Sequence, residues 1–148
     1  MKTYKSTVSE FKLAFNKTKF VKVKIQSSRD AVEYARQFYH EDLNIYESSF
    51  IMLLNRANNI IGYAKISQGG IAGTVIDVKI VAKYAIDSLA SGIILFHNHP
   101  SGNLIPSDSD KNITRIVKNT LNIFDCNLVD HCIITDTEYY SFADSGDL

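Results

Sequence analysis

The sequence has few cysteines, the residues whose disulfides stabilise small secreted proteins, and it has no hydrophobic segment typical of a membrane span or a signal peptide. It contains two cysteines and no tryptophan among its 148 residues. Cys126 and Cys132 have the spacing of neither a disulfide framework nor a zinc cluster, which suits packed thiols in a reducing compartment. No apolar run approaches the roughly 18 residues of a membrane span, and no signal-peptide core opens the chain. We therefore expect a cytoplasmic protein that does not enter a membrane.

The chain also lacks an excess of charge of either sign. Lys plus Arg and Asp plus Glu each number 16, so the net charge is zero. A domain that binds duplex DNA usually carries a basic excess. Only the N-terminal part leans basic, and we interpret its lysines, from Lys2 to Lys24, as a solvated edge. DNA therefore stays open as a partner, but the charge does not support it.

Proline is scarce as well, and both prolines fall in one short stretch, residues 96–110. This stretch follows the apolar run 92–96, which is typical of a buried strand, and it leads into a helical periodicity. His97 and His99 stand two residues apart at the strand exit, so their imidazoles can point to the same side. Asp110 falls in the first turn of the next helix. Two His and a carboxylate leave a fourth position open, as in catalytic zinc sites, so we predict a metal site.

Several short sequence motifs of this chain resemble those of a known superfamily. The pattern His-x-His, seven residues, Ser107, two residues, Asp110 resembles the JAMM/MPN+ metalloprotease motif. The words His-Asn-His-Pro-Ser-Gly, then Asp130-His131, then Tyr-Ser-Phe at 140–142 resemble the RadC-like JAB branch of that superfamily, over roughly residues 27–148. The resemblance implies that His97, His99 and Asp110 bind Zn²⁺.

The resemblance also implies two catalytic residues. Ser107 would stabilise the oxyanion of the tetrahedral intermediate, and a glutamate ahead of an apolar strand would act as the general base. Glu47 stands directly before such a strand and is the match, with Glu41 and Asp42 as alternatives. A carboxylate in this position can take a proton from the attacking water and pass it to the leaving amine.

Each part of the motif also has a structural interpretation. Ser107-x-x-Asp110 before an apolar run is a helix capping box with Asp in place of Glu, and such a cap can orient Asp110 for ligation. Glu47 taken alone would be a solvated residue at a strand start. Asp130 and His131 form a buried polar pair that is expected either to hydrogen-bond a loop or to orient a metal ligand by hydrogen bonding, and we favour a structural role over a catalytic one. His40 is expected to cap the end of a helix.

The remaining periodicities predict an α/β domain with a mixed sheet flanked by helices. This agrees with the JAMM/MPN (cytidine-deaminase-like) architecture that the resemblance implies. We expect a lead segment at 1–19 with a weak amphipathic helical pattern, and a RadC-like JAMM/MPN domain at 20–148. Strands are expected at 20–25, 47–54, 60–66, 92–96, 128–135 and 139–142. Helices are expected from Ser27 or Ser28 to 39, after Asp77 with Leu89 on its apolar face, and from Ser107 with Phe124 on its apolar face. The resemblance implies that the glycine-rich loop 69–74 lies near the site, and a plain turn-rich connection is the alternative.

These expectations favour a zinc-dependent hydrolase that cleaves a peptide or isopeptide bond, with a peptide or protein as substrate. The alternative is a DNA-repair-associated accessory or nucleic-acid-binding module whose zinc is structural or vestigial, since the RadC name implies DNA repair. RadC-like proteins often carry an N-terminal helix-hairpin-helix segment, for which residues 1–19 leave no room. A third hypothesis, metal-dependent cleavage of a phosphodiester, has less support, because two-metal sites use more carboxylates than this loop offers.

Overall fold

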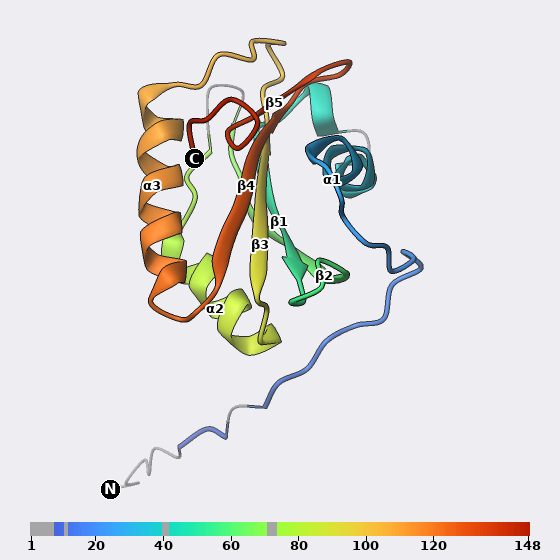
Figure 1. The fold of residues 1–148 in the computed structure, drawn as a ribbon, viewed down its shortest axis with the longest axis vertical. Helices are drawn as coiled ribbons and strands as arrows, with labels where there is room; N and C mark the ends of the chain where they lie inside the picture. Colours follow the sequence, from blue (N-terminus) through green and yellow to red (C-terminus); the bar gives the residue numbers. More distant parts are fainter. Residues whose placement is uncertain (1–7, 11, 40–41, 71–73) are drawn as a thin grey trace, which may run out of the picture.

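A five-stranded mixed sheet forms the centre of the protein (Figure 1). The computed structural model describes residues 8–10, 12–39, 42–70 and 74–148. Across the sheet the strands follow the order β2-β1-β3-β4-β5. Their bounds are β1 Ser48–Leu54, β2 Ile60–Gln68, β3 Gly92–Asn98, β4 Asn127–Ile134 and β5 Tyr139–Ser141. The predicted fold class, an α/β domain with a mixed sheet, is confirmed.

The sheet combines two hairpins with one parallel pair. β1 pairs antiparallel with both β2 and β3, and β4 pairs antiparallel with β5. β3 and β4 run parallel, and α3 (Asp108–Asn122) makes the crossover between them. The C-terminal end of β3 therefore meets the N-terminal end of α3 at one edge of the sheet, where a loop of nine residues, 99–107, joins them. This junction carries the motif.

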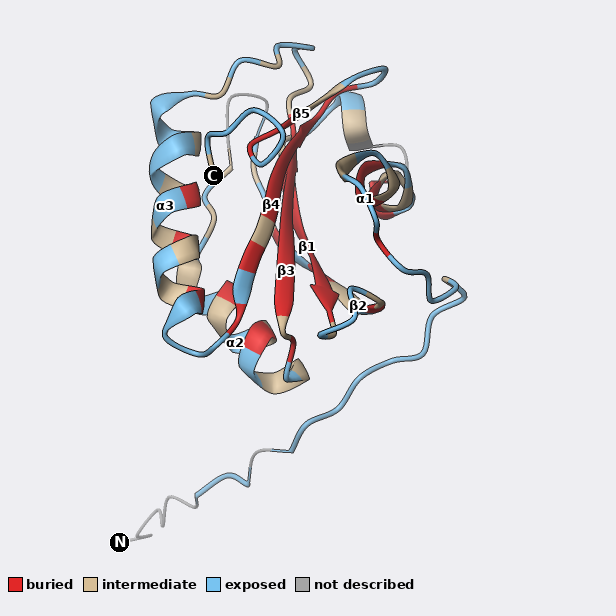
Figure 2. Ribbon diagram, viewed as in Figure 1, coloured by how far each residue is buried: buried red, intermediate tan, exposed pale blue. Residues whose placement is uncertain are grey.

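Helices cover both faces of the sheet and bury alternate residues of each central strand. On one face, α1 (Ser28–Ala35) and the 3₁₀ turn Arg36–Phe38 pack against one set of strand residues. On the other, α2 (Val78–Ser88) and α3 pack against the alternate set. Within β1, Phe50, Met52 and Leu54 belong to the first core, and Ile51 and Leu53 to the second. Both faces being covered, β1 and β3 are buried along their whole length (Figure 2).

The helices begin where the sequence predicts their caps. The side chains of Ser27, Asp77 and Ser107 each accept a hydrogen bond from a backbone N–H in the first turn of the helix that follows. Each of these N-caps satisfies one amide that the helix itself cannot. For α3 the capping box is complete, because the Asp110 side chain also accepts from the Ser107 backbone N–H. The capping interpretation of Ser107-x-x-Asp110 is therefore correct.

The strand expected at 20–25 does not form. This segment makes one isolated bridge, between Lys24 and Asn59, and Val21 and Val23 are exposed. Only its end lies beside the 55–59 turn and the start of β2, so the alternating pattern has no full partner strand to pair with. The lead segment likewise shows no helix at residues 8–10 and 12–19. Its described part extends away from the body of the domain (Figures 1 and 2). The apolar side chains of Val8, Leu13 and Phe15 are exposed.

Two residues assigned to apolar helix faces are exposed instead. Leu89 ends α2 in a left-handed conformation, with φ of 52°, and is 85% exposed. Phe124 lies beyond the end of α3 and is 47% exposed. Both extend a helical period past the point where the helix stops. His40 lies outside the described residues. Among the described residues, none of the helices has the length and apolarity needed to cross a membrane.

Candidate metal centre

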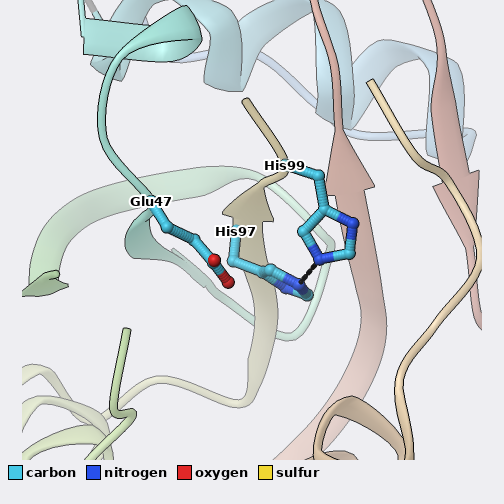
Figure 3. A group of neighbouring side chains, drawn as sticks. All are labelled: Glu47, His97 and His99. Atoms are coloured by element: carbon cyan, nitrogen blue, oxygen red, sulfur yellow. Dashed lines mark hydrogen bonds between the residues drawn. The ribbon is translucent and has the colours of Figure 1, made fainter. Parts of the chain in front are cut away.

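The two motif histidines converge at the exit of β3. His97 is the penultimate residue of the strand and is buried, while His99 follows it and is partly exposed. Their Nε2 atoms lie 2.9 Å apart (Figure 3). His99 Nδ1 lies 2.6 Å from the backbone carbonyl of Asn103. A carbonyl oxygen can only accept, so His99 Nδ1 carries the hydrogen and its Nε2 presents a lone pair toward His97.

The Asp110 carboxylate faces the same pair of nitrogens. Its Oδ1 lies 3.2 Å from His97 Nε2 and its Oδ2 lies 3.7 Å from His99 Nε2. Oδ2 also accepts from the Ser107 backbone N–H at 2.7 Å. Burial acts to raise the pKa of this carboxyl, but the neighbouring His97 and the hydrogen bond from Ser107 outweigh burial and hold the pKa well below its usual value. Asp110 is therefore ionised, as a carboxylate ligand must be.

Glu47 reaches the site from the residue before β1. Glu47, His97 and His99 each offer one atom that could bind a metal, and these three atoms lie within 4.8 Å of one another (Figure 3). The glycine-rich loop holds the Glu47 backbone, because the Gly69 N–H donates to the Glu47 carbonyl and the Glu47 N–H to the Gly70 carbonyl. Residues 71–73 of that loop, Glu41 and the side chain of Asp42 lie outside the described residues.

Asn98, between the two histidines, is a residue that sequence reasoning missed. It is completely buried, and its amide NH₂ donates to the backbone carbonyls of Leu43 and Tyr46, each at 2.7 Å. Its Oδ1 accepts from the Ser48 N–H at 2.8 Å. These three bonds tie the segment that carries Glu47 to the strand that carries the histidines. A polar residue within a buried strand, between the two histidines, was the available signal.

Replacing Asn98 with alanine should destabilise the protein by about 2–4 kcal/mol, because one buried and two partly buried backbone groups lose their partner. The measurement is chemical unfolding of the metal-free protein. Asn122→Ala, at an exposed position at the end of α3, is the matched control and should change stability by less than about 0.5 kcal/mol. Equal stabilities of the two variants would show that the amide does not hold this segment.

Ser107 is held beside Asp110 by the capping box. Its Oγ accepts from the Asp110 backbone N–H at 3.1 Å, and its own N–H donates to the Asp110 carboxylate. The capping box at the start of α3 thus fixes the position of the Ser107 side-chain oxygen. The hydroxyl hydrogen of Ser107 is not used by this cap.

Asp130 and His131 are adjacent in the sequence, but their side chains make different contacts in the structure. Asp130 accepts hydrogen bonds from the N–H groups of His131 and Ala143, from the Ser141 hydroxyl and from the Cys132 thiol. These bonds tie β4 to β5 and the C-terminal turn. The His131 side chain instead contacts a motif residue, because its Nε2 lies 2.8 Å from His97 Nδ1. Burial, together with the nearby His97, holds the pKa of His131 well below its usual value, so its ring is neutral.

A shallow cleft opens directly beside these groups. Glu47, His97 and Asp110 line it on one side, with Thr74–Ile76 and the first turns of α3 around them. Val75 is 84% exposed at its edge. A ligand in this cleft therefore meets the His97 imidazole and the carboxylates of Glu47 and Asp110 at once.

An α/β domain with a mixed sheet, whose central strand ends in His-x-His against a helix-borne aspartate, is a JAB/MPN-type domain. Residues 25–147 match the family model described as the RadC-like JAB domain. The chain belongs to this family.

The chain is also similar to proteins named UPF0758 from several organisms. The chain is 46% identical over 123 residues to a UPF0758 protein of Flavobacterium johnsoniae, covering 83% of this chain and 53% of the relative. It is 42% identical over 101 residues to a UPF0758 protein of Porphyromonas gingivalis, covering 68% and 44%. A UPF0758 protein of Chlorobaculum parvum is 34% identical over 121 residues, covering 82% and 54%. The chain thus spans about half the length of the curated relatives it matches.

Proposed function

We propose that this domain is a zinc-dependent hydrolase that cleaves an amide bond in a peptide or protein, either a peptide or an isopeptide linkage. The observation that supports it is the convergence of His97 Nε2, His99 Nε2 and the Asp110 carboxylate, with Nε2 atoms 2.9 Å apart and Asp110 oxygens at 3.2 and 3.7 Å. Groups that each offer a lone pair or a negative charge repel one another at such distances, and a metal ion bound between them would offset that repulsion.

The donor set fits zinc. Two imidazole nitrogens and one carboxylate are typical zinc ligands, and three protein ligands leave a position for water or substrate. Mg²⁺ and Ca²⁺ prefer sites made of oxygen atoms. His97, His99 and Asp110 would hold the ion at the mouth of the cleft. When bound in such a site, zinc lowers the pKa of a coordinated water from 15.7 to about 7 and polarises the substrate carbonyl.

Two residues of the chain would then carry the proton and the charge. The Glu47 carboxylate, within 4.8 Å of the imidazole nitrogens, would accept the proton of the attacking water and return it to the leaving amine. The Ser107 hydroxyl would donate to the oxyanion, a contribution of roughly 3 kcal/mol for one such donor. We place the reaction in the cytoplasm, because both cysteines are unpaired, as is usual in reducing compartments.

The test is the metal content and activity of the protein purified without added metal or chelator. We expect about one zinc per chain by mass spectrometry of the metal, because the three ligands form one site. We also expect cleavage of members of a peptide and isopeptide library that a chelator abolishes and added zinc restores.

Two outcomes would contradict the proposal. Protein that contains no zinc and cannot be loaded at neutral pH would exclude the hydrolase. Zinc-loaded protein that cleaves no amide but binds DNA with a steep salt dependence would support a nucleic-acid-binding module in its place.

A further inference from the structure

A buried network of three side chains lies directly behind the candidate ligands. Thr114 is on α3, one turn after Asp110, and its hydroxyl lies 2.6 Å from the Asp110 backbone carbonyl and 2.6 Å from His131 Nδ1. His131, on β4, lies 2.8 Å from His97 Nδ1 through its Nε2. Thr114 is 2% exposed, His131 is fully buried and His97 is 1% exposed. The network therefore joins three elements out of reach of solvent.

Only one placement of hydrogens satisfies these contacts. The Asp110 carbonyl has no hydrogen, so the single Thr114 hydrogen points to it and Thr114 accepts from His131 Nδ1–H. A fully buried imidazole whose contacts are a hydroxyl and another imidazole remains neutral. His131 Nε2 is then a lone pair, so His97 Nδ1 must carry the hydrogen. The lone pair of His97 is left on Nε2, which faces His99 and Asp110.

The ring of His131 is also fixed in orientation. It stacks on Phe142 with ring centroids 4.7 Å apart and an interplanar angle of 6°. Its own backbone N–H donates to Asp130. Rotation of the ring by 180° would exchange Nδ1 and carbon positions and break the contacts to both Thr114 and His97. The packing therefore permits one orientation.

We propose that Thr114 and His131 are positioning residues that lock His97 in its Nδ1–H tautomer and so direct its Nε2 lone pair at the metal. This inference rests on the proposed zinc site. Loss of a group that orients a histidine ligand typically weakens metal binding by roughly 10–100-fold. Thr114 and His131 contact no ion themselves, so their effect passes entirely through His97.

The first experiment compares zinc affinity among variants that keep the packing, by competition with a chromophoric chelator. Thr114→Val should bind zinc about 10-fold more weakly and His131→Phe up to about 100-fold. Thr114→Ser, which keeps the hydroxyl, and His131→Gln, whose amide can accept from His97 and donate to Thr114, should recover most of the affinity. Thr120→Val, on the same helix, is the matched control and should leave the affinity unchanged. Circular dichroism of each metal-free variant checks the fold.

The second experiment reads the tautomers directly and needs no variant. Long-range ¹H–¹⁵N correlation spectra of the zinc-loaded wild-type protein should show His131 and His97 both protonated at Nδ1. Protonation of His131 at Nε2, or unchanged zinc affinity in folded Thr114→Val, would overturn this inference and leave the proposed hydrolase intact. Wild-type protein that takes up no zinc would overturn both.

Discussion

Asp110→Ala and His97→Ala should each purify without zinc. Removing one of three protein ligands should weaken binding by more than the roughly 100-fold upper limit for losing an orienting group. The remaining His99 and one other ligand would form too few bonds to retain the ion during purification. Metal analysis of the variants beside the wild type measures the effect.

Two further variants separate ligation from helix capping at the same place. Asp110 accepts from the Ser107 N–H, so Asp110→Ala also removes part of a cap, at about 1 kcal/mol. Asp110→Asn keeps an acceptor for that bond but loses the charge, so it should keep the cap and still bind zinc weakly. Asp108→Ala, exposed in the same helical turn, should retain one zinc per chain. A full zinc content in Asp110→Ala would exclude Asp110 as a ligand.

The local part of the site could be predicted because the sequence itself brings it together. His97 and His99 are two residues apart at the exit of a strand, and Asp110 lies three residues after its own N-cap. Strand period and capping chemistry place these side chains without knowledge of the rest of the fold. Glu47 is different, because it stands fifty residues earlier and only the family resemblance singled it out. The structure brings it to the histidines through the antiparallel pairing of β1 with β3.

The groups behind the ligands depend on long-range packing that no local pattern encodes. His131 meets His97 because β3 and β4 pair in parallel, with Leu95 opposite His131. Thr114 reaches His131 because α3 packs on that face of the sheet. In the sequence, His131 and Asp130 look alike as a buried polar pair. Their opposite side-chain directions, one toward the metal site and one toward the C-terminal turn, follow from the strand period together with the side on which α3 lies.

The prediction of a strand at 20–25 failed for a similar reason. An alternating pattern such as 20–25 records which side chains are apolar and carries no information about whether a partner strand exists. Only Ile25 of its apolar residues becomes buried beside the turn. The strands that did form, such as β1 and β3, are apolar on both faces and lie between two layers of helices. For them, burial of both faces favours one arrangement.

Glu47→Gln should keep one zinc per chain and lose amide hydrolysis by about 10²–10⁴-fold, the usual contribution of a general base. The amide side chain keeps the size of Glu47 but cannot accept a proton from water. Its backbone bonds to Gly69 and Gly70 do not involve the side chain, so the strand start should be undisturbed. The measurement is the initial rate on the best substrate from the library screen, together with the zinc content of the same sample.

The pairing of the two measurements decides what Glu47 does. Glu33→Gln, exposed on α1, removes a carboxylate from the opposite face of the sheet and should leave both zinc content and rate unchanged. If Glu47→Gln loses zinc, the carboxylate is a ligand, which its position within 4.8 Å of the imidazole nitrogens would allow. If it keeps both zinc and full rate, the base is another group, and Glu41 and Asp42 become the next carboxylates to replace. Retained zinc together with a lost rate is the one combination that assigns Glu47 to proton transfer. Replacing a metal ligand would lower the zinc content as well, and replacing a residue without a role in the site would change neither quantity.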